Sequence, residues 1–318
     1  MKTRPLGRTG LEIAPVVLGG NVFGWTADEA TSFRVLDAFV GSGMNAIDTA
    51  DIYSAWVPGN QGGESETILG KWFKANPSKR SKVVLITKVG SKFGPEKEGL
   101  SERWIKTAVE DSLRRLQTDA IDLYLSHWPD PKVPYEETLK AFSDLVKAGK
   151  VRAVGASNLN AEQLANSLRA AASHSLPRYD VLQPEYNLMT RTTFEGPLQK
   201  LVVSEQIAVI TYFSLASGFL SGKYRTEQDF GKSARGSGMA KYLDERGRRV
   251  LGVLDTVCAE VHAQPSEVAL AWLLAKPGVT APIASATSTA QVESLVRAAT
   301  LELTADQVRR LDQASLAD

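Results

Sequence analysis

Four side chains suited to moving a proton follow successive short apolar runs of the sequence. Asp48 and Tyr53 follow one run, Lys88 follows the next, and His127 follows the one after that. A free phenol has a pKa near 10, and a neighbouring ammonium favours the phenolate, so we expect Lys88 to lower the pKa of Tyr53. Asp48 can hold that ammonium in place, and His127 can fix a substrate oxygen. The set predicts a tyrosine that gives a proton to a substrate near neutral pH.

Each of these side chains also has an ordinary structural explanation. An aspartate at a strand end often caps a turn, a lysine is usually solvated, and a histidine or tyrosine is more often packed than catalytic. Lys88 directly follows an apolar run, which places it at the mouth of any barrel that the run helps to build. Their joint occurrence at successive strand ends supports proton transfer more than any one residue does.

The elements that would position these residues repeat along the chain. A short apolar run, a turn and an amphipathic helical pattern recur about every 40 residues, as expected of a strand with its crossover helix. The runs are Val16–Leu18, Ala46–Ile47, Val83–Ile86, Ile121–Leu125, Val151–Val154, Val181–Leu182, Ile207–Ile210 and Pro282–Ala284. Unbroken Val, Ile and Leu runs are typical of parallel strands buried on both faces. Eight units favour a closed (β/α)8 TIM barrel, with an open doubly wound sheet as the alternative.

Apolar residues at helical spacing predict helices between the runs. The clearest are Ser101–Gln117, Tyr135–Ala148, Asn160–Ala172 and Thr289–Ala298. Because no linker-like stretch divides the chain, we expect residues 1–318 to form a single domain.

Three segments fall outside the repeat. Residues 2–13 predict an N-terminal β-hairpin that turns between Gly7 and Gly10. Residues 221–247 are polar and rich in Gly and Arg, which is typical of a lid or binding loop. Thr304–Gln313 predicts an extra C-terminal helix.

Composition argues against several classes of protein. The 318 residues carry 37 Lys and Arg against 36 Asp and Glu, without the basic surplus of a nucleic-acid binder. A single cysteine, Cys258, and three histidines leave little material for disulfides or a metal centre and suit the cytoplasm. No apolar run approaches the roughly 20 residues that span a bilayer. We expect a cytoplasmic protein, monomeric by default, with no metal, nucleic-acid or membrane partner.

Motifs of other enzyme classes are missing from the sequence. There is no His-Glu-x-x-His or His-x-His cluster for a metal and no Gly-x-Ser-x-Gly for a nucleophilic serine. The glycine-rich stretch from Gly231 to Gly238 does not match a phosphate-binding loop, which needs a Lys-Ser/Thr pair after its second glycine. A glycosidase would need two facing carboxylates, and Asp48 and Glu185 are the pair that the sequence could offer.

Five separated motifs resemble the aldo-keto reductase superfamily. They are Asp48-Thr-Ala-Asp51-Ile-Tyr53, Leu85-Ile-Thr-Lys88, Leu123-Tyr-Leu-Ser-His127-Trp128, Gly155-Ala-Ser157-Asn158 and Gln183-Pro-Glu-Tyr186-Asn187. The opening Leu6-Gly-Arg-Thr-Gly-Leu11 and Leu18-Gly-Gly are similar to the bacterial branch shared with potassium-channel β subunits. The resemblance runs from residue 4 to the last helix. It implies a (β/α)8 barrel that binds NADPH or NADH without a Rossmann domain.

The resemblance also implies a role for each residue at the barrel rim. Tyr53 would be the general acid/base, with Lys88 and Asp48 tuning its pKa, and His127 would orient a carbonyl group. The implied reaction is hydride transfer from the nicotinamide C4 to the carbonyl carbon, with an alcohol as product. The residues implied around the nicotinamide are Ser157, Asn158 and Gln183 at its carboxamide, Tyr212 stacked on its ring, and Phe213 and Ser214 beside it.

The phosphates of the cofactor are expected at two places. Leu215, Ser217, Gly218 and Lys223, after the seventh strand, match the family's pyrophosphate loop, although Lys223 also suits a plain surface loop. At strand eight, where many members have a basic residue, this chain instead has Ser285, Ala286, Thr287 and, further on, Gln291. Hydroxyl groups and the start of the next helix can bind the 2′-phosphate of NADP or a bare ribose. NADP(H) is the favoured cofactor, and NAD(H) is the alternative.

Aromatic residues after the strands predict the substrate side. Phe23, Trp25, Trp56 and Trp128 suggest a bulky or ring-shaped carbonyl or sugar-like ligand, although packing in the core or a lid explains each of them equally well. An NAD(P)H-dependent carbonyl reductase or alcohol dehydrogenase with a small-molecule carbonyl or alcohol substrate is therefore the main hypothesis. The alternatives are a cofactor-binding regulatory module with little turnover, like the channel β subunits, and an isomerase or lyase barrel without nicotinamide.

Overall fold

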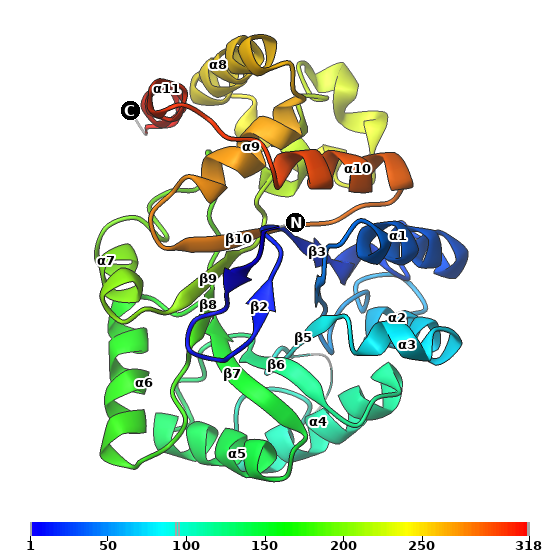
Figure 1. Cartoon of the computed structure of the whole chain (residues 1–318), viewed down its shortest axis with the longest axis vertical. Helices are drawn as coiled ribbons and strands as arrows, with labels where there is room; N and C mark the ends of the chain where they lie inside the picture. Colours follow the sequence, from blue (N-terminus) through cyan, green and yellow to red (C-terminus); the bar gives the residue numbers. More distant parts are fainter. Residues whose placement is uncertain (1, 93, 95, 317–318) are drawn as a thin grey trace.

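Eight parallel strands close into a barrel in the computed structural model, which describes residues 2–92, 94 and 96–316 (Figure 1). In chain order they are β3 (Val17–Gly19), β4 (Ala46–Asp48), β5 (Val84–Val89), β6 (Ile121–Ser126), β7 (Val151–Ser157), β8 (Val181–Gln183), β9 (Ala208–Thr211) and β10 (Val279–Ala284). Each strand pairs with the next, and β10 closes the ring on β3. The predicted (β/α)8 barrel is confirmed, since every expected apolar run contributes to a strand, and the open sheet is excluded.

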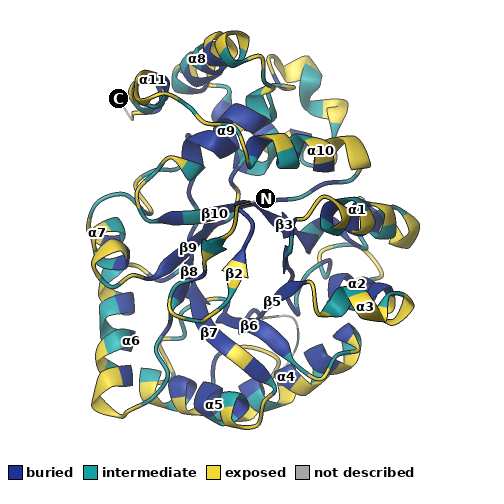
Figure 2. Ribbon diagram, viewed as in Figure 1, coloured by how far each residue is buried: buried dark blue, intermediate teal, exposed yellow. Residues whose placement is uncertain are grey.

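Helices surround the barrel and connect its strands. They are α1 (Glu29–Gly41), α2 (Glu64–Ala75), α3 (Pro77–Arg80), α4 (Glu102–Leu116), α5 (Tyr135–Lys147), α6 (Ala161–Ser173), α7 (Pro197–Ser204), α9 (Pro265–Leu274) and α10 (Thr289–Ala298). Most of these helices have an exposed outer face and an inner face that is buried against the barrel, whereas α9 is buried nearly all round and α3 buries no residue (Figure 2). The four helices predicted most clearly match α4, α5, α6 and α10 to within one residue at each end.

Side chains at the helix starts explain where two of these helices begin. Ser101 accepts a hydrogen bond from the backbone N–H of Trp104 at the start of α4. At the start of α6, Asn160 and Gln163 each accept a hydrogen bond from the other's backbone N–H. Such caps satisfy N–H groups that have no partner inside the helix, and each contributes about 1 kcal/mol. The capping residues also mark where the loops after β5 and β7 end. These loops follow the strand ends that carry residues of the site.

The N-terminal segment forms the predicted hairpin and closes one end of the barrel. Its two antiparallel strands are β1 (Arg4–Pro5) and β2 (Glu12–Ile13). Leu6 and Ile13 are fully buried in the cluster that fills the barrel interior. The Arg4 guanidinium donates to the carbonyl oxygens of Val279, at 3.4 Å, and Thr280, at 3.1 Å, where β10 begins. The hairpin therefore seals the end where the strands start.

The chain between β9 and α9 departs from the simple repeat. The predicted loop over residues 221–247 contains short 3-10 helices at Glu227–Lys232 and Gly236–Tyr242. It ends inside α8 (Glu245–Val261), a helix that the sequence analysis did not identify. α8 packs against the predicted C-terminal helix, α11 (Ala305–Ala314), outside the ring of barrel helices (Figure 1).

The structure also bears on membrane and metal binding. No helix in the described part of the chain is long and apolar enough to cross a membrane. Within the same residues, no three or more His, Cys, Asp or Glu side chains are grouped so that they could hold a metal ion.

Candidate active site

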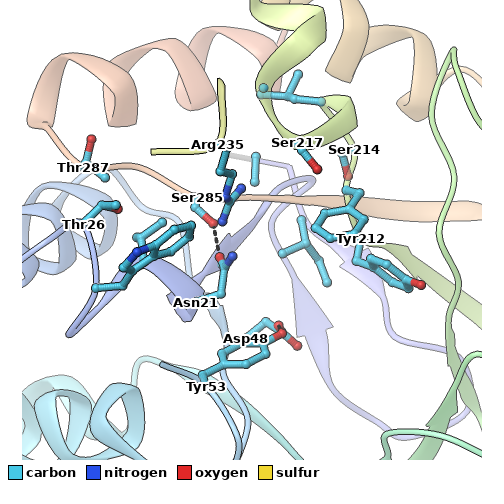
Figure 3. Close-up of a pocket in the computed structure, with 18 of the residues that line it drawn as sticks. Asn21, Thr26, Asp48, Tyr53, Tyr212, Ser214, Ser217, Arg235, Ser285 and Thr287 are labelled. Carbon is cyan, nitrogen blue, oxygen red and sulfur yellow. Dashed lines mark hydrogen bonds between the residues drawn. The ribbon is translucent and has the colours of Figure 1, made fainter. Parts of the chain in front are cut away.

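The site lies at the end of the barrel opposite the hairpin, and the alternation of side chains along the strands determines its composition. Residues such as Ile86 and Leu125 fill the barrel interior. The residue two positions further along a strand faces the same way, one layer nearer the rim. This register brings to the rim Gly19, Asp48, Lys88, His127, Ser157, Gln183, Tyr212 and Ser285. A cavity of about 620 Å³ opens above them (Figure 3).

A buried ion pair forms the floor of this cavity. The Lys88 ammonium lies 2.7 Å from both carboxylate oxygens of Asp48 and donates to the Tyr53 hydroxyl oxygen at 3.0 Å. That hydroxyl donates to Asp48 Oδ2 at 3.2 Å, and the Gln183 amide donates to Asp48 Oδ1 at 2.9 Å. Lys88 and Asp48 are buried, and Asp48 and Tyr53 line the cavity. The structure thus brings together three of the four predicted catalytic residues.

Burial dominates the ionisation of this group. It raises the pKa of Tyr53 well above 10, and the Asp48 carboxylate beside the phenol raises that pKa further. Burial also lowers the pKa of Lys88, against the opposing effect of Asp48. The expectation that Lys88 lowers the pKa of the phenol is therefore corrected, because burial and Asp48 outweigh the ammonium. The phenol keeps its proton at neutral pH.

His127, the fourth predicted catalytic residue, lines the same cavity from the end of β6. Its Nδ1 lies 2.9 Å from the Ser91 hydroxyl oxygen, and its carbonyl oxygen accepts from the Asn158 amide at 2.9 Å. Burial, and then the charge of Lys88, holds its pKa well below 6.5. The imidazole is therefore neutral at neutral pH, and Nε2 has no partner among the described residues.

Polar side chains at the ends of β7, β8 and β9 form one wall of the cavity. Ser157 donates to the Gln183 carbonyl oxygen at 2.7 Å, and the Asn158 amide donates to the Ser157 hydroxyl at 3.1 Å. The Tyr212 hydroxyl donates to the Asn158 amide oxygen at 2.7 Å. Asn158 has a φ of 63°, a left-handed conformation that asparagine tolerates better than most residues. The four predicted residues Ser157, Asn158, Gln183 and Tyr212 therefore meet in one hydrogen-bonded network.

The loop after β9 turns sharply beside this network. Phe213, Ala216 and Ser217 all have positive φ angles, of 48°, 47° and 56°. Such angles are rare for a bulky side chain, and strained residues of this kind cluster at functional sites. The predicted residues of this loop all line the cavity: Phe213, Ser214, Leu215, Ser217, Gly218 and Lys223.

The end of β10 and the start of α10 form the remaining wall. Ser285, Thr287 and Gln291 line the cavity, as predicted. The backbone N–H of Thr287 donates to the Gln291 side-chain oxygen at 2.7 Å, and the N–H of Gln291 donates to the Ser288 hydroxyl at 3.3 Å. Both N–H groups therefore have side-chain partners already, and that of Gln291 lies at the helix start where a phosphate was expected.

Three tryptophans border the mouth of the cavity. The rings of Trp25 and Trp56 meet edge to face, 5.7 Å apart, and Trp56 lies 6.1 Å from Tyr53. Trp128 stacks on His127 with ring centres 6.0 Å apart. Trp56 and Trp128 are about half exposed, at 48% and 49%. These aromatic surfaces face the place where a ligand would approach Tyr53.

The structure corrects two predicted contacts. Phe23 and Ala286 are fully buried in the core between strands and helices, and neither lines the cavity. Ala286 follows the inward-facing Ser285 by one position, so alternation turns its side chain toward the helices.

Several residues of the site were not predicted from the sequence, and three of them make contacts that matter here. Asn21 accepts a hydrogen bond from Ser285, Ser91 contacts His127, and Arg235 lies over the Trp25 ring. Asn21 follows β3 by two positions, a strand-end location like that of the predicted rim residues. Ser91 follows β5 by two positions in the same way, but its role depends on His127, which follows the neighbouring strand β6. The sequence indicated Arg235 only indirectly, because it lies in the polar segment 221–247 that was predicted to be a lid or binding loop.

Comparisons with known proteins agree with this geometry. A family model described as "Aldo/keto reductase family" matches residues 15–316. "Uncharacterized oxidoreductase YrpG" from Bacillus subtilis is 36% identical over 315 residues, which cover 96% of this chain and 94% of that protein. "Aldo-keto reductase YhdN" from the same organism is 33% identical over 306 residues, covering 93% and 88%. A protein of Schizosaccharomyces pombe, provisionally named a voltage-gated potassium channel subunit beta, is 32% identical over 328 residues, covering 98% and 92%.

Proposed function

The chain belongs to the aldo/keto reductase family, and from that premise we propose that it interconverts an aldehyde or ketone and the corresponding alcohol, using a nicotinamide dinucleotide. The observation that carries this proposal is the Tyr53 hydroxyl, which borders the cavity and is bonded to both members of the buried Lys88–Asp48 pair. This arrangement offers a proton donor next to a cation that stabilises the charge left on the donor.

The cavity contains groups that fit such a cofactor. Asn158, Gln183 and Ser157 carry the amide and hydroxyl groups that complement a carboxamide, and the aromatic ring of Tyr212 lies beside them. Lys223, with the sharply turned loop over residues 213–218, would hold the pyrophosphate. When bound, the cofactor supplies or accepts the hydride, and the protein holds both reactants in position.

Tyr53 acts as the proton donor when a carbonyl group is reduced. Its raised pKa keeps the phenol protonated, and the substrate oxygen takes the place of Asp48 as acceptor of its hydrogen. The negative charge left on the phenol oxygen then lies 3.0 Å from the Lys88 ammonium, which stabilises it. In the direction of alcohol oxidation, the same groups take the proton back.

His127 positions the same substrate oxygen. A carbonyl oxygen can only accept hydrogen bonds, so the productive tautomer of the neutral imidazole carries its hydrogen on Nε2. Ser91 favours this tautomer by donating its hydroxyl hydrogen to Nδ1, 2.9 Å away. The substrate carbonyl is then held between two donors, the phenol and the imidazole.

The choice between the two cofactors depends on the cavity wall at Ser285 and Thr287. The cations that line the cavity within the described residues are Lys223 and Arg235, and neither comes from β10 or α10. A 2′-phosphate at this wall would therefore meet neutral hydroxyl groups rather than a cationic partner. We propose that NADP(H) binds through these hydroxyls and that NAD(H) binds with similar affinity.

A cofactor-binding module with little turnover is the second candidate, since one relative carries the name of a channel subunit. Such a module needs to bind the cofactor but has no need to transfer a proton. The complete set of Tyr53, Lys88, Asp48 and His127 therefore favours an enzyme.

The substitution Tyr53→Phe tests the proposal. We expect it to lower the turnover of an unactivated ketone roughly 100-fold or more, the usual contribution of general acid catalysis. The Kd for NADPH, measured by cofactor fluorescence, should stay unchanged because the phenol acts on the substrate oxygen. Tyr135→Phe, on the outer helix α5, is the matched control and should retain activity.

Two outcomes would contradict this assignment. A Tyr53→Phe enzyme with a near-native rate would show that another group is the acid. A wild-type protein that binds NADPH but reduces none of a panel of aldehydes and ketones would support the regulatory module instead.

A further inference from the structure

Two side chains tie together the loops that follow β3 and β4. Ser54, in the β4 loop, donates its hydroxyl hydrogen to the Phe23 carbonyl oxygen in the β3 loop at 2.8 Å. The ring of Phe23 is buried in the core, which makes its carbonyl group a fixed anchor. Asn60 donates its amide hydrogens to the carbonyl oxygens of Gly24 and Ser54, at 3.2 and 3.0 Å. Together Ser54 and Asn60 form a loop clamp, which bonds the β3 loop at two successive residues.

The backbone at Ser54 is strained. Its φ is 72°, in the left-handed region that few residues other than glycine adopt, and its side chain is fully buried. Strained residues persist only where their surroundings fix them, and they cluster at functional sites. Ser54 directly follows Tyr53, the proposed acid. The hydrogen bonds of the loop clamp therefore fix a strained turn beside the reacting group.

Tyr53 has anchors of its own. Its hydroxyl group is bonded to Lys88 and to Asp48, at 3.0 and 3.2 Å, and both of these residues belong to barrel strands. The hydrogen bonds of Ser54 and Asn60 all go to backbone carbonyl oxygens of the two loops instead. Loosening the loop clamp would therefore leave the acid in place and act on other parts of the rim.

The tryptophans at the mouth of the cavity depend on the loop clamp more directly. Trp25 follows Gly24 in the β3 loop, and Trp56 follows Ser54 by two positions in the β4 loop. Their rings meet edge to face, with centres 5.7 Å apart, so the pair spans both loops. Trp56 is 48% exposed, and a half-exposed ring gains less from burial than a ring in the core. The relative position of the two loops therefore decides whether the pair forms.

We propose that the loop clamp holds Trp25 and Trp56 together as one wall for flat carbonyl substrates. A flat substrate with its carbonyl group at Tyr53 would lie against this wall, since Trp56 is 6.1 Å from the Tyr53 ring and both tryptophans line the cavity. A short aliphatic substrate needs only the groups around its carbonyl oxygen. Ser54 and Asn60 do not line the cavity, so they are positioning residues that act through the tryptophans. The inference rests on the proposed function for the reaction and adds the residues that select among its substrates.

The first experiment compares Asn60→Asp with the wild type on 2-naphthaldehyde, which is flat and long, and on propanal, which is short. Aspartate keeps the size of the side chain, but its carboxylate can only accept hydrogen bonds and so repels the two carbonyl oxygens. We expect kcat/KM for naphthaldehyde to fall about 3- to 10-fold, the weight of one aromatic contact, and that for propanal to change less than about twofold. The loss should lie mainly in KM, because the wall binds the substrate without taking part in the reaction.

A second variant and a matched control accompany this comparison. Ser54→Gly removes the other half of the loop clamp and preserves the turn, because glycine adopts a positive φ readily. It should show the same selective loss. Asn76→Asp is the control, since the Asn76 amide donates to the Trp72 carbonyl oxygen at 3.0 Å at the end of α2, and neither residue lines the cavity. This control loses the same kind of bond and should leave both values unchanged.

A double substitution distinguishes a positioning role from a purely structural one. Trp25→Leu removes half of the wall and should itself lower kcat/KM for naphthaldehyde. In that background we expect Asn60→Asp to add less than about twofold, because substitutions that act through one contact are not additive. Fully additive losses would show that Asn60 acts elsewhere and would overturn the proposal.

Circular dichroism tests the loop clamp without substrate or cofactor. The near-ultraviolet signal reports the fixed packing of aromatic side chains, and the far-ultraviolet signal reports secondary structure. We expect Asn60→Asp to weaken the part of the near-ultraviolet signal that Trp25→Leu removes from the wild type. The far-ultraviolet signal should stay the same in both variants.

The outcomes separate this inference from the proposed function. An equal effect on both aldehydes, a loss confined to the Kd for NADPH, or an unchanged near-ultraviolet signal in Asn60→Asp would overturn the role of the loop clamp. A wild type that reduces no carbonyl compound would instead refute the proposed reaction. A weakened near-ultraviolet signal in the variant would then still support a clamp that positions the tryptophan wall.

Discussion

Tyr53 and His127 show how one physical cause shifts two pKa values in opposite directions. Burial disfavours the charged form of any group, so it raises the pKa of the phenol and lowers that of the imidazole. The phenol then loses its proton only at high pH, and the imidazole gains one only in acid. Both groups are therefore uncharged across the neutral range, the state that carbonyl reduction requires.

A pH profile with a wide plateau follows from these shifts. We expect kcat/KM for carbonyl reduction to be level from about pH 6.5 to 9 and to fall in acid only below 6.5, where His127 becomes charged. Steady-state rates in buffers of constant ionic strength provide the measurement. An inflection at or above pH 6.5 would contradict the placement of His127 and the tautomer assigned to it.

Ser91 should affect catalysis through the imidazole alone. We expect Ser91→Ala to lower kcat about 5- to 30-fold, because one hydrogen bond that fixes the tautomer is worth about 1–2 kcal/mol. Ser91→Thr, which keeps the hydroxyl group, should restore most of the rate. The acid limb of the pH profile should also move in the alanine variant, whereas the Kd for NADPH should not. An unchanged limb together with a lowered melting temperature would indicate a structural role only.

At the scale of elements, α2 and α4 are neighbours that approach closely at a glycine. A Cβ added to Gly70 in α2 would lie 2.0 Å from the Arg115 carbonyl oxygen in α4, far inside contact distance. The same addition at Gly252 in α8 meets no atom within 4 Å. These two helical glycines therefore form a matched pair that differs in packing alone.

Alanine at these two positions should change stability in opposite directions. We expect Gly70→Ala to lower the free energy of unfolding by about 1–3 kcal/mol, because α2 must move away from α4. Gly252→Ala should raise it by about 0.5–1 kcal/mol through helix propensity. Urea unfolding followed by circular dichroism measures both, and equal effects of the two substitutions would contradict the packing described.

The elements that the sequence predicted well are those with a local signal. The apolar runs are strands because a parallel barrel buries both faces, and Ser101 and Asn160 mark helix starts because they cap them. The segment before α8 carries weaker signals, since Asp229 accepts hydrogen bonds at the start of one 3-10 helix and Asp244 caps α8. Its position also depends on tertiary contacts such as Arg225 with Asp255, which no local pattern encodes.

The site was predictable to the same extent. Asp48, Lys88 and His127 follow inward-facing strand residues by two positions, so their meeting at the rim follows from the barrel itself. The high pKa of Tyr53 did not follow, because it depends on burial by the whole fold rather than on the nearest cation. The place of Phe23 in the core depends in the same way on packing between distant segments.

At the scale of the whole molecule, cofactor binding should appear as added stability. A ligand that binds only the folded state raises the free energy of unfolding by about 2.7 kcal/mol at a concentration of 100 Kd. With neutral hydroxyls at Ser285 and Thr287, we expect NADPH and NADH to raise Tm to within about 4 °C of each other at equal concentrations, a Kd ratio below about tenfold. Differential scanning fluorimetry tests this. A much larger shift with NADPH would reveal a partner for the 2′-phosphate that these hydroxyls do not provide.

The hairpin at the sealed end of the barrel has a consequence for the order of folding during synthesis. Arg4 lies 275 positions before Val279 in the chain, yet it bonds to that residue where β10 begins. At a translation rate of about 5–20 residues per second, the ribosome needs roughly 14–55 s to synthesise the chain from Arg4 to Val279. Leu6 and Ile13 lie in the barrel interior of the folded protein, so their apolar side chains cannot reach their final environment during that time. Closure of the barrel is thus a late event of biosynthesis. A chain released before β10 is made lacks the strand that closes the barrel and anchors the hairpin.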